Sequence, residues 1–150
     1  MIYHICLLSL VAFTVGCGKT EMANVAAPTT ENDDVAITEA DVKLPATYSA
    51  AIPQIKGYRD TIRTAIEAGT PSKAHRSLDE LDIVLNKLPS IAKDSGVPKE
   101  QWETINLTGR ELRDLFNQLH SAIDAKREPD YKAVAEPIDQ TIAKLEQVTQ

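Results

Sequence analysis

The sequence is poor in cysteine: Cys6 and Cys17 are the only two among its 150 residues, and both lie near the N-terminus. No C-x-x-C-H motif occurs, which excludes covalently attached c-type haem. Zinc sites made of cysteine need several thiolates close together, so they are excluded too. The region after Cys17 has no cysteine from which to form a disulfide.

Aromatic residues and clusters of positive charge are also scarce. Aromatic residues make up 5% of the chain, and the formal net charge is −6. Nucleic acids and anionic lipid surfaces call for a clustered basic patch, whereas Lys and Arg are scattered here. Glycine-rich phosphate loops, G-x-S-x-G and H-E-x-x-H are absent. We therefore expect no nucleic-acid partner, no enzymatic activity and no catalytic residues.

The longest apolar run is Ile5 to Val15, at the N-terminus. Its length is typical of the apolar region of a signal peptide and falls short of the roughly 20 residues of a spanning helix. The run leads into Thr14-Val15-Gly16-Cys17, which resembles the lipobox of bacterial lipoproteins. This resemblance implies a signal peptide over 1–16 and a lipid on Cys17.

The resemblance also implies a location. A lipid on Cys17 would anchor the protein to a membrane on the periplasmic side of the cell envelope, and Gly18, rather than Asp, favours the outer membrane. Two features depart from the pattern: Thr14 stands where Leu is usual, and no Lys or Arg precedes the apolar run. An ordinary cleaved secretory peptide and a short hydrophobic anchor are the alternatives.

Residues 17–44 are predicted to form an acidic, flexible tether. From Gly18 to Leu44 there are two Lys against six Asp and Glu, without a sustained hydrophobic period. Such a segment buries too little apolar surface to offset the entropy of ordering. From Pro45 onward the charges nearly balance, and a folded domain is predicted over 45–150.

The clearest helical signal in this domain runs from Gln101 to Asp124. Its apolar residues recur at spacings of three, four and seven, which is the period of one helical face. They are Ile105, Leu112, Leu115, Phe116, Leu119 and Ile123. Leu107 falls on the opposite, polar face. A stripe of this kind is stable only when other helices cover it.

Three further helices are predicted, over Ala46 to Ala68, Pro71 to Lys93 and Pro129 to Val148, each with a similar stripe. The short connections predict antiparallel neighbours. The fold class is therefore all-α: an antiparallel up-down-up-down four-helix bundle of two helical hairpins. Pro53, Pro89 and Pro137 are expected to kink helices or to mark their first turns.

The two hairpins resemble one another in sequence. Ala65 to Ala68 parallels Ala122 to Ala125, which lies 57 positions later, and Lys87-Leu88 parallels Lys144-Leu145 at the same offset. A duplicated hairpin would explain this likeness, and so would two unrelated hairpins that obey one bundle pattern.

His75 and His120 are the candidate metal or haem ligands, since both are expected at the same end of the bundle. On idealised helices, His120 borders the apolar stripe, whereas His75 faces water beside Asp79. A di-iron site of the ferritin type needs Glu three residues before each His, where Ser72 and Asn117 stand. We therefore expect neither a metal site nor a cofactor.

In its helical pattern the domain resembles small exported four-helix bundles, a class that includes periplasmic cytochromes, although it lacks their haem motifs. The sequence thus predicts a non-enzymatic, lipid-anchored interaction or structural module of the cell envelope, with a possible protein partner. One alternative is a haem or metal carrier for electron transfer that uses His120 and perhaps His75. Another is a hydrophobic-ligand binder with a cavity between kinked helices.

Overall fold

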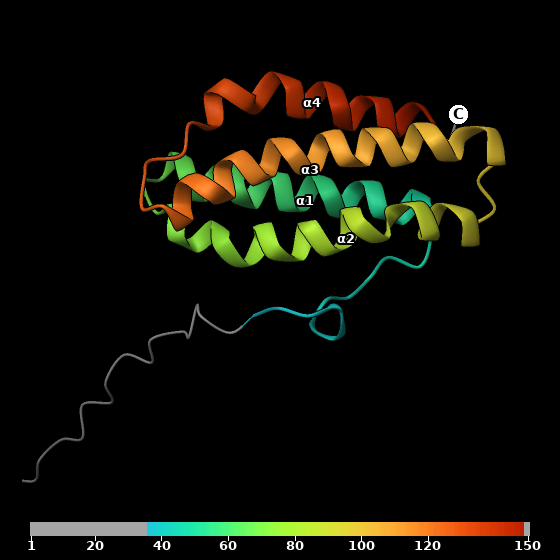
Figure 1. The fold of residues 1–150 in the computed structure, drawn as a ribbon, viewed down its shortest axis with the longest axis horizontal. Helices are drawn as coiled ribbons and strands as arrows, with labels where there is room; N and C mark the ends of the chain where they lie inside the picture. The colour runs from blue at the N-terminus through green and yellow to red at the C-terminus, as the bar shows by residue number, and fades with distance from the viewer. Residues whose placement is uncertain (1–35, 149–150) are drawn as a thin grey trace, which may run out of the picture. The chain divides into compact units, whose positions relative to one another are not determined.

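The computed structural model describes residues 36–148, in which four helices pack against one another (Figure 1). The helices are α1 (Tyr48–Glu67), α2 (His75–Asp94), α3 (Trp102–Asp124) and α4 (Tyr131–Gln147). Short 3-10 helices are η1 (Glu39–Asp41), η2 (Pro71–Ala74) and η3 (Lys99–Gln101). The predicted all-α, antiparallel four-helix bundle is confirmed. The predicted signal peptide, the lipidation site Cys17 and most of the tether lie outside the described residues.

Local sequence explains where the helices begin and end. The side chain of Thr47 accepts a hydrogen bond from the Ala50 amide and that of Asp130 accepts one from the Ala133 amide, so each satisfies a free donor of a first turn. Gly69 follows α1 with a φ of 69°, a conformation in which glycine carries no steric cost. The turn into η2 then reverses the chain.

The three prolines that were expected to kink helices or to mark their first turns all lie inside helices. Pro53 is in α1, Pro89 in α2 and Pro137 in α4. A proline has no amide hydrogen to donate to the carbonyl four residues earlier, which costs stability in an isolated helix. Packing of each helix against its neighbours offsets this cost.

The core runs along the inside of the bundle, and α2 and α3 share its largest helix–helix interface. Leu107 is 57% exposed, as expected. The predicted stripe of α3 is partly wrong, since Leu115 and Ile123 are only partly buried, whereas Thr108 and Gly109 are buried. Gly109 faces Leu85 and Leu88 of α2, so this helix covers small residues that a hydrophobicity pattern does not identify.

The predicted boundary between tether and domain at Pro45 is also wrong. Val42 is 7% exposed and belongs to the core, and Ile37 and Leu44 pack against it. Lys87 of α2 forms an ion pair with Glu39 at 2.6 Å. The acidic composition of this segment concealed three apolar side chains, so the folded unit includes residues before Pro45. Among the described helices, none has the length and apolar character needed to cross a membrane.

Candidate functional site

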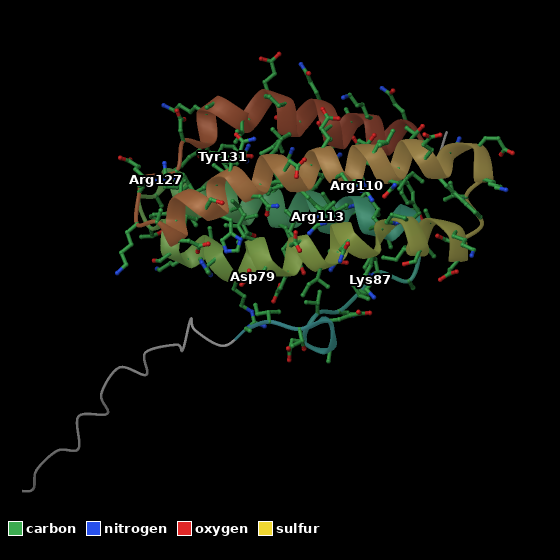
Figure 2. All side chains as sticks on the ribbon, in the orientation of Figure 1. Asp79, Lys87, Arg110, Arg113, Arg127 and Tyr131 are labelled. Atoms are coloured by element: carbon green, nitrogen blue, oxygen red, sulfur yellow. The ribbon has the colours of Figure 1, made fainter. Side chains whose placement is uncertain are left out.

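Two histidines and two aspartates converge where α2 packs against α3. His75 and Asp79 lie one turn apart on α2, and His120 and Asp124 lie one turn apart on α3. The cluster is near the end of the bundle that carries both hairpin turns; Figure 2 labels Asp79 on α2 and Arg127 at this end. The side chains are between 21% and 56% exposed, so solvent reaches the cluster.

The histidine rings contact each other directly. Their centroids are 4.5 Å apart with planes at 82°, and the two Nε2 atoms are 3.2 Å apart. This differs from the expectation that His75 faces water away from His120. His75 and Asp82 lie on the same flank of α2, and Asp82 bonds to Arg113 of α3. This flank therefore faces α3 rather than open solvent, and the ring of His75 reaches His120.

The aspartates complete the cluster on either side of the rings. His75 Nε2 is 2.6 Å from Asp124 Oδ1, and since a carboxylate only accepts, the imidazole donates this hydrogen bond. His120 Nε2 is 3.6 Å from Asp79 Oδ1 and 3.7 Å from Asp124 Oδ1. The expected His75–Asp79 neighbours approach to 3.8 Å between Nδ1 and Oδ2.

The hydrogen bond from His75 lowers the pKa of Asp124 below its ordinary value. Slight desolvation opposes this and raises the pKa, while the electrostatic effects of both rings are smaller and lower it; the hydrogen bond is the largest cause. Asp124 is therefore ionised at neutral pH, so its carboxylate can accept a hydrogen bond or bind a cation.

Three of these side chains have the donor set of a metal site. One nitrogen each from His75 and His120 and one oxygen from Asp79 lie within 4.8 Å of one another. A metal in tetrahedral coordination with bonds of about 2.0–2.1 Å separates its ligand atoms by roughly 3.3 Å. The 3.2 Å and 3.6 Å separations around His120 Nε2 are close to this value. The geometry therefore suits a small ion.

Asp124 was not among the residues singled out from the sequence. A signal for it exists, because His75 and His120 each precede an aspartate by four residues, as H-x-x-x-D. Residues four apart lie on one helical face, so each helix presents one His-Asp pair. Only the packing of α2 on α3 shows that the two pairs meet.

The α2–α3 seam beside the cluster is closed. The space bounded by Leu81, Arg113, Phe116 and His120, with their neighbours, does not admit a water molecule. Arg113 donates to both oxygens of Asp82, at 2.7 and 3.1 Å, and joins the helices there. A porphyrin would need this packing to open, so the structure favours an ion over haem at His120.

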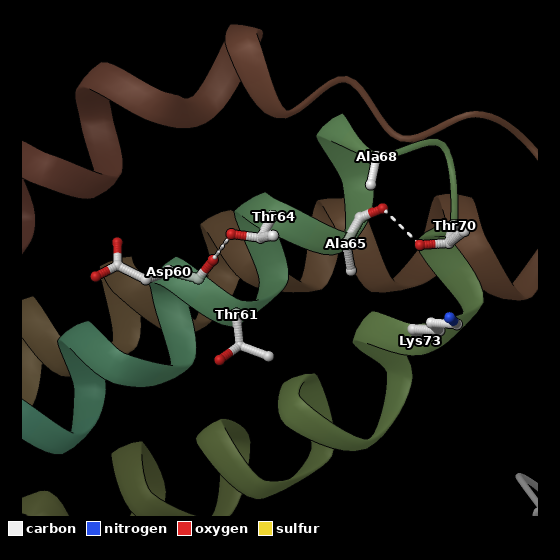
Figure 3. A pocket seen from close by; sticks show the side chains of 7 residues that line it. All are labelled: Asp60, Thr61, Thr64, Ala65, Ala68, Thr70 and Lys73. Carbon is white, nitrogen blue, oxygen red and sulfur yellow. Dashed lines mark hydrogen bonds between the residues drawn. The ribbon is translucent and has the colours of Figure 1, made fainter.

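A larger depression, of about 480 Å³, lies outside the bundle along α1 and η2 (Figure 3). Its threonine hydroxyls bond to their own backbone: Thr64 donates to the carbonyl of Asp60 at 2.8 Å and Thr70 to that of Ala65 at 3.2 Å. These hydroxyls are thus already satisfied. The depression is open and lacks convergent polar groups, unlike typical ligand sites.

In comparisons with protein-family models, with curated proteins and with solved structures, nothing matches this chain. The functional argument therefore rests on the geometry of the cluster.

Proposed function

We propose that this protein is a non-enzymatic, membrane-anchored module of the cell envelope that binds a divalent transition-metal ion between α2 and α3. The observation that carries the proposal is the convergence of His75, His120 and Asp79 from two helices. It supports the metal-binding alternative of the sequence analysis over a purely structural module. The expectation of no metal site was based on a His75 that faces water and on the absence of Glu three residues before each His, where Ser72 and Asn117 stand.

The donor types indicate the class of ion. Imidazole nitrogen suits zinc, copper, nickel and iron, whereas calcium and magnesium prefer oxygen alone. His75 Nδ1 lies 3.8 Å from Asp79 Oδ2, which is too long for a hydrogen bond that would fix the ring. Together with the partial exposure of the cluster, this favours a readily exchanged ion. Such a site suits carriage or buffering of metal.

The closed seam supports binding rather than catalysis. A catalytic metal keeps an open position and a space for substrate beside it. The seam next to His120 does not admit water, so a substrate could approach only from solvent. The absence of catalytic motifs in the sequence points the same way.

Anchorage through Cys17 is the second part of the proposal. It is supported by the apolar run that ends at Gly16-Cys17 and by the acidic segment after it. A lipid on Cys17 would hold the bundle near the membrane on the periplasmic side, with the outer membrane favoured. There the module could exchange metal with a protein partner of the envelope.

Isothermal titration of the purified chain with Zn²⁺ tests metal binding. We expect one ion per chain, and a melting temperature that rises with free Zn²⁺ because the ion binds only the folded state. The variants His75→Ala and His120→Ala should each lose stoichiometric binding. Asp114→Asn, at an exposed position of α3, is the matched control and should bind as the unmodified chain does. Equal binding by the His75→Ala/His120→Ala double variant would overturn the proposal.

A further inference from the structure

The two hairpins of the bundle share one pattern of burial. Every buried residue of α1 has a buried counterpart in α3 that lies 57 positions later. The pairs are Tyr48 and Ile105, Ala51 and Thr108, Ile52 and Gly109, Ile55 and Leu112, and Ile62 and Leu119. Along α2 and α4 the same offset pairs Leu81 with Ile138, Leu85 with Ile142 and Leu88 with Leu145.

The hairpins also turn in the same way. After α1, the Gly69 amide donates to Ile66 O and the Thr70 amide to Ala65 O. After α3, the amides of Lys126 and Arg127 donate to Ile123 O and Ala122 O, each 57 positions further on. Both turns place a residue at positive φ, 69° at Gly69 and 52° at Lys126. The end of α2 has the same turn, in which the amides of Gly96 and Val97 donate to Lys93 O and Ala92 O. This turn is a common helix ending, so the shared pattern of burial is the observation that favours a repeat of one hairpin.

A repeat makes the α2–α3 seam equivalent to the α4–α1 seam. Asp82 of α2 and Asp139 of α4 are equivalent positions, and each forms an ion pair with an arginine of the adjacent hairpin. Arg113 of α3 lies 2.7 Å from Asp82, and Arg59 of α1 lies 2.6 Å from Asp139. The two seams are thus joined by the same kind of contact.

Toward the hairpin turns the seams differ in charge. The α2–α3 seam carries His75, Asp79, His120 and Asp124. The equivalent positions, at the offset of 57, are Lys132, Glu136, Arg63 and Glu67. The two acidic positions are thus acidic in both hairpins, while the positions of the two histidines hold Lys132 in α4 and Arg63 in α1.

Having histidines in place of the two cations leaves an imbalance of charge in the α2–α3 seam. In α4 and α1 the formal charges of Lys132, Arg63, Glu136 and Glu67 sum to zero, and Arg63 forms an ion pair with Asp60 at 3.3 Å. Imidazoles that bind a metal are neutral and add no charge, so two carboxylates remain in the α2–α3 seam. A divalent cation supplies the two missing charges, and the histidines supply its nitrogen ligands.

We propose that the α2–α3 seam is a differentiated copy of a charged seam in which a divalent metal ion, held by His75, His120, Asp79 and Asp124, replaces two side-chain cations. This inference rests on the proposed metal binding and adds to it Asp124 as a ligand and a structural role for the ion's charge. On binding, the ion takes the place of the proton that His75 Nε2 shares with Asp124.

The role of Asp124 is tested by Asp124→Asn, with Asp114→Asn as the control. Zn²⁺ titration should show an affinity lower by at least about 10-fold in Asp124→Asn, the lower end of the loss found for partners outside the ligand shell. The control should be unchanged. Unchanged affinity in Asp124→Asn would overturn its assignment as a ligand. Absence of binding to the unmodified chain would instead overturn the proposed function itself.

The role of charge is tested by two double variants that both remove the metal ligands. His75→Gln/His120→Gln leaves the seam without cations, whereas His75→Lys/His120→Arg introduces the cations of the equivalent seam. In metal-free, low-salt buffer the Lys/Arg variant should melt several degrees above the Gln/Gln variant, and 1 M NaCl should narrow the gap. The unmodified chain should gain a similar increment with Zn²⁺. Equal melting of the two variants at low salt would overturn the inference.

Discussion

The hydroxyl of Tyr48, at the start of α1, donates a hydrogen bond of 2.9 Å to the carbonyl oxygen of Leu145, near the end of α4. The same residue's amide donates to Ser95 Oγ, which follows α2, at 2.9 Å. Tyr48 is 1% exposed. The side chain and the backbone amide of this one buried residue thus connect α1 with α4 and with the end of α2, at the end of the bundle opposite the histidines.

Burial raises the pKa of Tyr48. The folded state keeps the phenol protonated, whereas the unfolded chain releases its proton near pH 10. The contribution of this group is therefore complete below about pH 10 and is lost as pH rises further. We expect the free energy of unfolding from urea titration to fall between pH 9 and pH 11.5, and to fall less in Tyr48→Phe. An identical decline in both proteins would contradict this. At pH 7, Tyr48→Phe should cost about 1 kcal/mol for the lost hydrogen bond.

The second prediction concerns the equivalent turns after α1 and α3. Lys126 has a φ of 52°, which is unfavourable for a residue with a Cβ, whereas Gly69 meets the same demand freely. Lys126→Gly should therefore stabilise the domain by roughly 0.5–1 kcal/mol in chemical denaturation. Gly69→Ala should destabilise it by about 1 kcal/mol through the backbone alone, since no atom lies within 4 Å of the added methyl. Destabilisation by Lys126→Gly would show that the side chain contributes more than the backbone strain.

The third prediction compares three leucines of α3. Leu112 is fully buried, so Leu112→Ala should cost about 2–5 kcal/mol. Leu115 is only partly buried and its truncation should cost less. Leu107→Ala, at the exposed face, should cost under about 1 kcal/mol. Thermal unfolding of the three variants gives the order, and a Leu115→Ala loss as large as that of Leu112→Ala would contradict the observed face of α3.

The fourth prediction concerns the anchor. If Cys17 carries a lipid, Cys17→Ser should move the protein from the membrane fraction to the soluble fraction of a cell extract. The circular dichroism of the bundle should not change, because Cys17 lies outside the described domain. Protein that remains in washed membranes after this substitution would point to a retained hydrophobic N-terminus instead.

The sequence by itself determined the helices and the order in which they pack. Periodic apolar residues, Gly69 and the proline after Thr70 carry local information, and helix formation responds to local signals. The observed helices therefore begin and end within a few residues of the predicted ones. The apolar stripe of α3 was right at Leu112, Phe116 and Leu119, since these side chains are buried by any covering helix.

Only the tertiary structure decided which residues of different segments contact one another. The burial of Thr108 and Gly109 depends on how closely α2 approaches. The burial of Val42 depends on its packing against the core, which no pattern in the acidic segment reveals. The meeting of His75 with His120 depends on which flank of α2 faces α3 and on the register of the two helices. Each helix encodes its own His-Asp pair four residues apart, but only packing brings the two pairs to one ion.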